Sequence, residues 1–301
     1  SIRYPAHCCG ILGLRTTDGL LPLDDIGPEG MAVPFRRLLS IGPMARTIAD
    51  LRLMLDVLCE PGAPASDRPT VRAPSERLRV AVSASWPGAE PLASTSALIE
   101  KLITGLRAAG HEVDTTAAPR IDIEHAWRVW GTIAGHELWS GTPALLNNRV
   151  TRAMFQSYML RRNLGEGPFT KWFSTGMTAT QRDYEDALTQ REKLLRAVDE
   201  FFESHDLWIQ PVAMGEAIRR QPRGNPIAVD GKEVPYSVFL GSYTVPSTAF
   251  GTPVLTMPIG FGDTGLPIGV QVHGARFSDR QLLDTAQRFL SKYITVSVPD
   301  R

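Results

Sequence analysis

The sequence predicts an α/β protein in which a mixed central β-sheet is covered by helices on both faces. Apolar residues alternate with other residues over 78–82, which is the period of a half-buried strand, and helical apolar spacing follows over 98–106. Two further apolar runs, 254–259 and 268–272, have the length of buried strands. Since strands and helices alternate along the chain, we expect one domain over 1–301 with a helical layer on each face of its sheet.

The first part of the chain, 1–60, is expected to hold core strands and loops. Residues 1–30 are rich in glycine and proline and carry short apolar patches, so we expect strand and loop there and no amphipathic helix. Over about 47–59, apolar residues recur at helical spacing ahead of a Pro-Gly pair, which predicts a helix. The polar, proline-rich residues 61–77 then predict a surface connector.

The middle of the chain is predicted to be mainly helical. After the first strand, a helix is expected to begin at the hydroxyl residues 94–96 and to end before Gly110, which suits the left-handed position that follows a helix. Residues 121–205 carry aromatic and apolar residues at helical spacing and predict a helical excursion from the core. Residues 206–301 are expected to return to the sheet and to close with a helix at about 278–291.

Composition excludes several classes of protein. The chain has 32 basic and 32 acidic residues, whereas nucleic-acid-binding proteins normally show a basic excess or stripe. A hydrophobic content of 43% with 21% charged residues is typical of a globular enzyme and excludes intrinsic disorder. The three cysteines, Cys8, Cys9 and Cys59, are too few for a disulfide framework, and neither a signal peptide nor a membrane-spanning run is recognised. We therefore expect a cytoplasmic protein whose partners include neither nucleic acid nor a membrane.

Two local motifs favour structural explanations. Residues 260–265 match G-x-G-x-x-G, but an apolar strand follows in place of the helix that would hold a pyrophosphate, so a hairpin turn is the better interpretation. His7, Cys8 and Cys9 are adjacent, and neighbouring residues of a strand point to opposite faces, so we do not expect them to close a metal site. No metal and no cofactor are expected.

The start of the chain carries the most specific pattern. Ser-Ile-Arg-Tyr-Pro-Ala at 1–6 is followed by Cys-Gly-Ile-Leu-Gly-Leu-Arg-Thr-Thr at 9–17. This pattern resembles the amidase signature family, in which the segments read Gly-Gly-Ser-Ile-Arg-x-Pro-Ala and Cys-Gly-x-x-Gly-Leu-Lys-Pro-Thr. The resemblance continues at Gly-Pro-Met-Ala-Arg (42–46) and over 206–211 and 251–271. It implies the amidase signature fold with the N-terminal part of that fold missing.

The resemblance also implies an amide hydrolase with a Ser–cis-Ser–Lys mechanism. Ser1 matches the nucleophile that accepts the acyl group, and Arg3 matches a residue that braces the nucleophile loop against an upstream acidic residue. In the family the lysine, the cis-serine and the glycine-rich oxyanion loop all lie upstream of the nucleophile, and none of them is in this sequence. We therefore expect this chain alone to be inactive and to need the N-terminal portion of the enzyme, on the same or a separate chain.

The substrate and several alternatives stay open at this point. An apolar or aromatic amide is suggested by aromatic residues that could line its pocket, although aromatic residues at helical spacing more often form a core. A glutamine amidotransferase subunit of a tRNA-dependent complex and a non-catalytic remnant of the fold are the alternative functions. A mechanism in which the Ser1 α-amine serves as its own base is a further option, and so is a homodimer. The candidate substrate-binding residues are Tyr4, Trp127, Trp130, Trp139 and Phe155.

Overall fold

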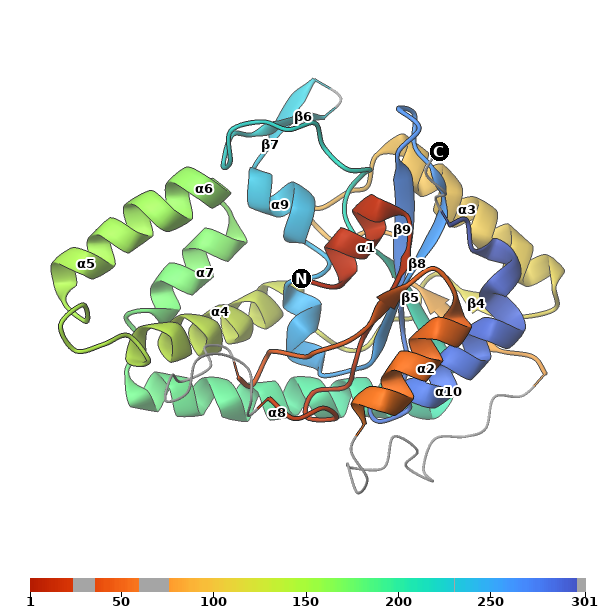
Figure 1. Cartoon of the computed structure of the whole chain (residues 1–301), viewed down its shortest axis with the longest axis horizontal. Coiled ribbons are helices and arrows are strands. Elements are labelled where there is room, and N and C mark those ends of the chain that lie inside the picture. The colour runs from red at the N-terminus through yellow and green to blue at the C-terminus, as the bar shows by residue number, and fades with distance from the viewer. Residues whose placement is uncertain (24–35, 60–75, 230, 297–301) are drawn as a thin grey trace.

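The centre of the molecule is a seven-stranded mixed sheet with the strand order β2-β1-β8-β9-β5-β3-β4 (Figure 1). The computed structural model describes residues 1–23, 36–59, 76–229 and 231–296. Strand β3 runs parallel to β4 and β5, whereas the other neighbouring strands pair antiparallel, which confirms the predicted mixed sheet. The strands are β1 (Leu12–Arg15), β2 (Met44–Ala45), β3 (Arg79–Val82), β4 (Glu112–Asp114), β5 (Leu207–Pro211), β8 (Val254–Phe261) and β9 (Pro267–His273), and a separate hairpin is formed by β6 (Ile227–Val229) and β7 (Lys232–Val234).

Helices cover both faces of the sheet, as the sequence predicts. In Figure 1 the helices within 123–176 lie to the left of the sheet, and the long helix over 181–204 runs along the bottom from there to below the sheet. The α-helices are α1 (Arg3–Cys9), α2 (Ile48–Leu58), α3 (Ala93–Ala108), α4 (Ile123–Ser140), α5 (Arg149–Met154), α6 (Arg162–Leu164), α7 (Pro168–Gly176), α8 (Gln181–Ser204), α9 (Tyr236–Gly241) and α10 (Asp279–Thr285). Two π-helical stretches, η1 (Phe155–Arg161) and η3 (Ala286–Leu290), and two 3₁₀ turns, η2 (Pro246–Phe250) and η4 (Ser291–Tyr293), complete the described part. None of the described helices combines the length and the apolar character that crossing a membrane requires.

The two faces of the sheet differ in chemistry because strand side chains alternate between them. One face is apolar and packs against α2, α3 and α10. The other face packs against α1, α4, α8 and η2, and its core contains polar side chains that are fully buried. We call this second surface the polar face; its polar members on the strands are Arg15, Gln210, Thr256, Gln271 and His273.

Most of the predicted elements are confirmed. The helix α2 begins after Thr47, whose hydroxyl accepts the Asp50 N–H, and α8 begins with a capping box at Thr180. The strands β8 and β9 form a hairpin in which the Gly262 N–H donates to the Leu266 carbonyl, so the glycine-rich motif is a turn. The connector predicted over 61–77 lies, apart from its last two residues, outside the described residues.

The prediction of strand and loop at the N-terminus is wrong for residues 3–9, which form α1. Pro5 falls in the first turn, where backbone N–H groups have no partner within the helix, and Gly10 ends the helix with a left-handed φ of 61°. His7, Cys8 and Cys9 are therefore consecutive residues of a helix, and the alternation of side chains along a strand does not apply to them. Among the described residues, no group of three or more His, Cys, Asp or Glu side chains is placed to hold a metal ion.

The start of α3 also differs from the prediction. Its N-cap is Leu92, and none of the hydroxyl groups at 94–96 caps the helix. Instead, the Leu92 N–H donates to the Met214 carbonyl at 2.7 Å, which ties the beginning of the helix to the chain that follows β5. This tertiary hydrogen bond explains why the helix begins before residues 94–96, which have the highest preference for the N-cap position.

Candidate functional site

Ser1 immediately precedes α1, which lies directly on the polar face. The contact is close because Gly13 of β1 has no side chain: a Cβ there would lie 2.9 Å from the Ala6 Cβ and 3.0 Å from Cγ2 of Ile2. Glycine at this position is therefore required for the close approach of helix and strand. Ser1 itself keeps an exposed surface at the N-terminal side of this packed helix.

Arg3 anchors the residues next to Ser1 to the polar face. Its buried guanidinium donates to Ser247 Oγ and Gln271 Oε1, both at 2.6 Å, and to Thr248 Oγ1 at 2.9 Å, and it also donates to the Thr244 carbonyl. All of these acceptors are neutral. Burial, followed by the positive charge of Arg15, lowers the pKa of Arg3 well below its ordinary value.

His7 ties the other end of α1 to the same sheet. The Gly269 N–H donates to His7 Nδ1 at 2.9 Å, and His7 Nε2 lies 3.0 Å from the Gly215 carbonyl. This pair of contacts fits the neutral tautomer with a proton on Nε2, which donates to the carbonyl. Burial lowers the pKa of His7 to about 4, so the ring is neutral at pH 7. The Tyr4 ring stacks on it with centroids 5.9 Å apart.

The environment of Ser1 is electropositive. The charged groups that act on Ser1 are the guanidinium groups of Arg3 and Arg15, and both are positive. The same charges favour a negative oxygen that develops near this residue. Arg15 is in turn held by an ion pair with Asp18, which also pairs with Arg191.

The chain offers no buried lysine as a base. All five lysines fall within the described residues, and each of them is exposed. A lysine serves as a base at neutral pH only when desolvation or neighbouring charge lowers its pKa, and exposed lysines lack the first of these causes. The exposed lysines are Lys101, Lys171, Lys193, Lys232 and Lys292.

The polar face also holds buried polar atoms without a partner in the described part of the chain. These are both amide atoms of Gln210, Thr256 Oγ1 and His273 Nε2. The Cα atoms of Gln210 and Thr256 both pair with Gln271 across neighbouring strands, so the three side chains share one face. Leaving a buried polar group without a partner costs about 1–3 kcal/mol, so this row is suited to receive further polar groups.

The sequence of β8 and β9 predicts that these polar side chains share one face of the sheet. It does not predict that this face is buried. On β9, Gln271 and His273 alternate with apolar residues, whereas on β8 the single polar residue Thr256 lies between two apolar ones. Such an alternation normally marks a face exposed to solvent. A polar face covered by other elements differs from an exposed one only in tertiary context.

The aromatic candidates lie in a different part of the molecule. Trp127, Trp130 and Trp139 are buried in the hydrophobic core that α4, α7 and α8 share, and Phe155 is half-buried at its edge. Tyr4 is half-buried on α1. We observe no contact between these tryptophans and Ser1. Their role in lining a substrate pocket stays a prediction.

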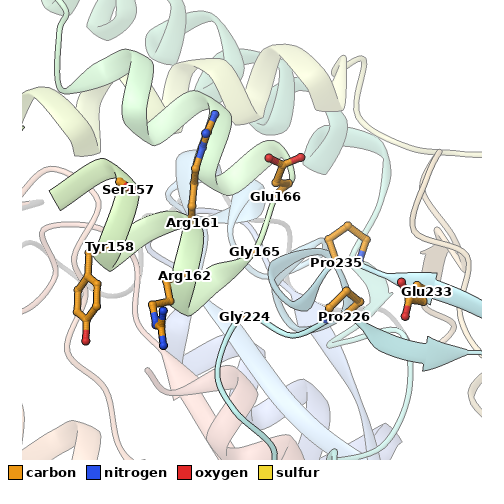
Figure 2. A pocket seen from close by; sticks show the side chains of 10 residues that line it. All are labelled: Ser157, Tyr158, Arg161, Arg162, Gly165, Glu166, Gly224, Pro226, Glu233 and Pro235. Carbon is orange, nitrogen blue, oxygen red and sulfur yellow. The ribbon is translucent and has the colours of Figure 1, made fainter. Parts of the chain in front are cut away.

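A hollow of about 680 Å³ opens between the end of η1, α6 and the β6–β7 hairpin (Figure 2). Side chains of both charges line it, with the arginines on the helix and the glutamates beyond them. None of the five aromatic candidates lines this hollow. The residues around it are Ser157, Tyr158, Arg161, Arg162, Gly165, Glu166, Gly224, Pro226, Glu233 and Pro235.

Known proteins resemble the chain over almost its whole length. The family model described as "Amidase" matches residues 1–283. A glutamyl-tRNA(Gln) amidotransferase subunit from Moorella thermoacetica is 27% identical over 310 residues, which cover 96% of this chain and 60% of that protein. The chain therefore spans about 60% of the length of the curated relatives it matches.

Solved structures show the same fold. One described as "Crystal structure of amidase" has a TM-score of 0.69 and 21% identity, and the match covers 98% of this chain and 61% of the other. A bacterial aryl acylamidase of the amidase signature family has a TM-score of 0.68 and 18% identity, with 94% of this chain and 58% of the other covered. At these identities the likeness concerns the fold alone.

Proposed function

The chain belongs to the Amidase family, that of the amidase signature enzymes, and from this premise we propose that it is the nucleophile-bearing portion of a hydrolase that cleaves carboxamide C–N bonds. The observation that carries the proposal is the placement of Ser1. The residue matches the family nucleophile, lies at the start of a helix that Arg3 and His7 fix to the sheet, and faces the positive charges of two arginines.

In the proposed reaction the Ser1 hydroxyl oxygen attacks the carbonyl carbon of the amide. The hydroxyl proton passes to a base, and the carbonyl oxygen becomes an oxyanion in a tetrahedral intermediate. The C–N bond then breaks as the nitrogen receives a proton, which releases ammonia or an amine and leaves an acyl ester on Ser1. Water attacks this ester, releases the carboxylic acid and restores the serine hydroxyl.

The proposed base is a lysine acting through a cis-serine, both supplied from outside this sequence. This part of the proposal is supported by the exposure of all five lysines of the chain. It is also supported by the buried polar atoms of Gln210 and Thr256 that lack partners among the described residues, since added polar groups would satisfy them. In the same proposal an acidic group from that segment pairs with Arg3, whose described acceptors are all neutral.

We propose an apolar or aromatic amide as the substrate, with Tyr4 and the aromatic residues of the helical region contributing to its binding. The alternative is glutamine, with the chain acting in an amidotransferase. The relatives described as glutamyl-tRNA(Gln) amidotransferase subunits favour this alternative. Hydrolysis of glutamine compared with hydrolysis of an aryl amide separates the two substrates.

The test uses two preparations: the isolated 301-residue chain, and the protein purified under native conditions with the polypeptides that remain bound to it. We expect hydrolysis of an aryl amide or of glutamine by the native preparation, its loss in Ser1→Ala, and no turnover by the isolated chain. Robust turnover by the isolated chain that depends on Ser1 would overturn the external base. Turnover by neither preparation, with folding intact, would favour a non-catalytic remnant.

A further inference from the structure

A basic, amphipathic helix forms the outer edge of the helical region. The elements α5, η1 and α6 follow one another from Arg149 to Leu164 and lie at the left-hand edge of the molecule, away from the sheet (Figure 1). Residues 142–165 contain four arginines and neither Asp nor Glu, although the formal net charge of the whole chain is zero. This helix therefore carries a net positive charge.

Large apolar side chains protrude from the same helix. Val150 is 70% exposed and Met154 is 66% exposed, and Tyr158 continues the series at the same spacing of four residues, which keeps the side chains on one side. Leu145 and Leu146 are exposed in the turn just before the helix. A contiguous apolar patch of this kind marks an interaction surface. We call these five side chains and the four arginines the basic helix surface.

The arginines lie at both ends of the apolar stripe. Arg149 is exposed at the N-terminal end, and Arg161 and Arg162 are exposed at the C-terminal end. The Arg162 guanidinium lies 5.7 Å from the centre of the Tyr158 ring, while Arg161 points in the opposite direction (Figure 2). The fourth, Arg152, lies over the ring of Trp139 at 5.1 Å. The surface thus has an apolar middle between positively charged ends.

Acidic side chains come close to the basic helix surface at its C-terminal end. Glu124 and Glu166 line one hollow together with Arg161, and Glu166 and Glu233 line the hollow of about 680 Å³. In that second hollow the two glutamates lie on the side away from Tyr158 and Arg162 (Figure 2). The apolar stripe itself lies within residues 142–165, which contain no Asp or Glu.

The exposed apolar residues of α2 lack this charge pattern. On α2, Leu53 is 65% exposed and Val57 is 78% exposed, close to the values for the basic helix surface. The charges around them are mixed, because Arg52 pairs with both Asp56 and Asp284. The α2 face therefore serves as a matched control for apolar exposure without positive charge.

We propose that the basic helix surface docks the protein on a membrane that carries anionic lipid headgroups. The apolar side chains enter the boundary between headgroups and acyl chains, and the arginines bind lipid phosphates and carboxylates, which is the usual arrangement of an interfacial helix. Charge favours this occupant over a second copy of the chain, because two apposed copies of residues 142–165 would bring like charges together with no Asp or Glu in either segment. The proposal does not depend on the hydrolase function, and it departs from the expectation, drawn from the sequence, that no membrane is a partner.

The test is flotation of the full chain with lipid vesicles. We expect binding to phosphatidylglycerol-containing vesicles, little binding to pure phosphatidylcholine, and loss of binding at high salt. The triple variant Arg149→Gln/Arg161→Gln/Arg162→Gln should bind about 100-fold more weakly, since each arginine near an anionic surface contributes roughly fivefold. The variant Val150→Ser/Met154→Ser should weaken binding by about tenfold or more.

The control is Leu53→Ser/Val57→Ser, which removes equal apolar exposure from α2 and should leave vesicle binding unchanged. Thermal unfolding of every variant checks that folding is intact; all substituted positions are exposed, so no large change is expected. Absence of binding to anionic vesicles would overturn the proposal. So would equal loss of binding in the α2 control, or a concentration-dependent dimer that Val150→Ser/Met154→Ser abolishes.

Discussion

The substitution Asp279→Asn should expose a pH dependence of stability that the native protein conceals. Asp279 is fully buried at the start of α10, where its carboxylate accepts the Thr17 N–H at 2.8 Å and the Thr17 hydroxyl at 2.6 Å. Burial raises the pKa of this carboxyl to about 6, against an ordinary value of 3.8. Burial lowers the pKa of His7 to about 4, against 6.5. The two groups therefore shift in opposite directions.

The magnitudes follow from proton linkage, at about 1.36 kcal/mol for each pKa unit. Between about pH 4 and 6 the folded protein keeps the Asp279 proton while the unfolded chain releases it, so Asp279 lowers stability by about 3 kcal/mol as the pH rises. From about pH 4 to 6.5 the unfolded chain holds a proton on His7 that the folded protein lacks, so His7 raises stability by about 3 kcal/mol. The two contributions nearly cancel.

Asn at position 279 imitates the protonated acid in size and does not ionise. The free energy of unfolding of Asp279→Asn, measured by urea titration, should therefore rise relative to the native protein by about 3 kcal/mol between pH 4 and 6.5. The reciprocal variant His7→Gln should fall relative to the native protein over the same range. A difference between Asp279→Asn and the native protein that does not change with pH would refute the reasoning.

Three further substitutions test the packing that positions Ser1 and the helical region. Arg3→Met should lower the free energy of unfolding by about 3 kcal/mol, because the buried acceptors of Arg3 lose their donor. Urea titration measures this change, and an unchanged free energy of unfolding would contradict it. Gly13→Ala should cost about 1–3 kcal/mol and lower the thermal midpoint, because the new Cβ meets the Ala6 Cβ at 2.9 Å. Gly176→Ala should lower the thermal midpoint further than Gly13→Ala, because its Cβ would lie 2.1 Å from the backbone oxygen of Gly131 where α7 crosses α4. Equal thermal midpoints for the two variants would contradict this ranking.

Elements with a long apolar period could be predicted from the sequence, whereas a short buried helix could not. The helices α2 and α8 repeat apolar residues over three or more turns, so local pattern and tertiary packing agree. Helix α1 has seven residues with proline near its start and glycine after its end, and local propensity favours a loop there. Contacts with the neighbouring β1 and with β8 and β9 stabilise it, and the last two strands are more than 240 residues away in sequence.

The candidate site divides in the same way. Ser1 and Arg3 could be singled out because their motif is contiguous in sequence. The acceptors of Arg3 could not, since Ser247 and Gln271 lie more than 240 residues away and reach it only through the folded sheet. The buried Gln210 could not be recognised either, because a polar residue at the end of a strand indicates exposure unless the covering elements are known.

The central claim is that the Ser1 oxygen carries the acyl group during amide cleavage. Turnover of an aryl amide or of glutamine by the natively purified protein should be quenched with acid, and the peptide that contains Ser1 should be analysed by mass spectrometry. The account predicts a mass increase equal to the acyl group, located on Ser1 and absent in Ser1→Ala. An acyl group found on another residue, or turnover preserved in Ser1→Ala, would contradict it.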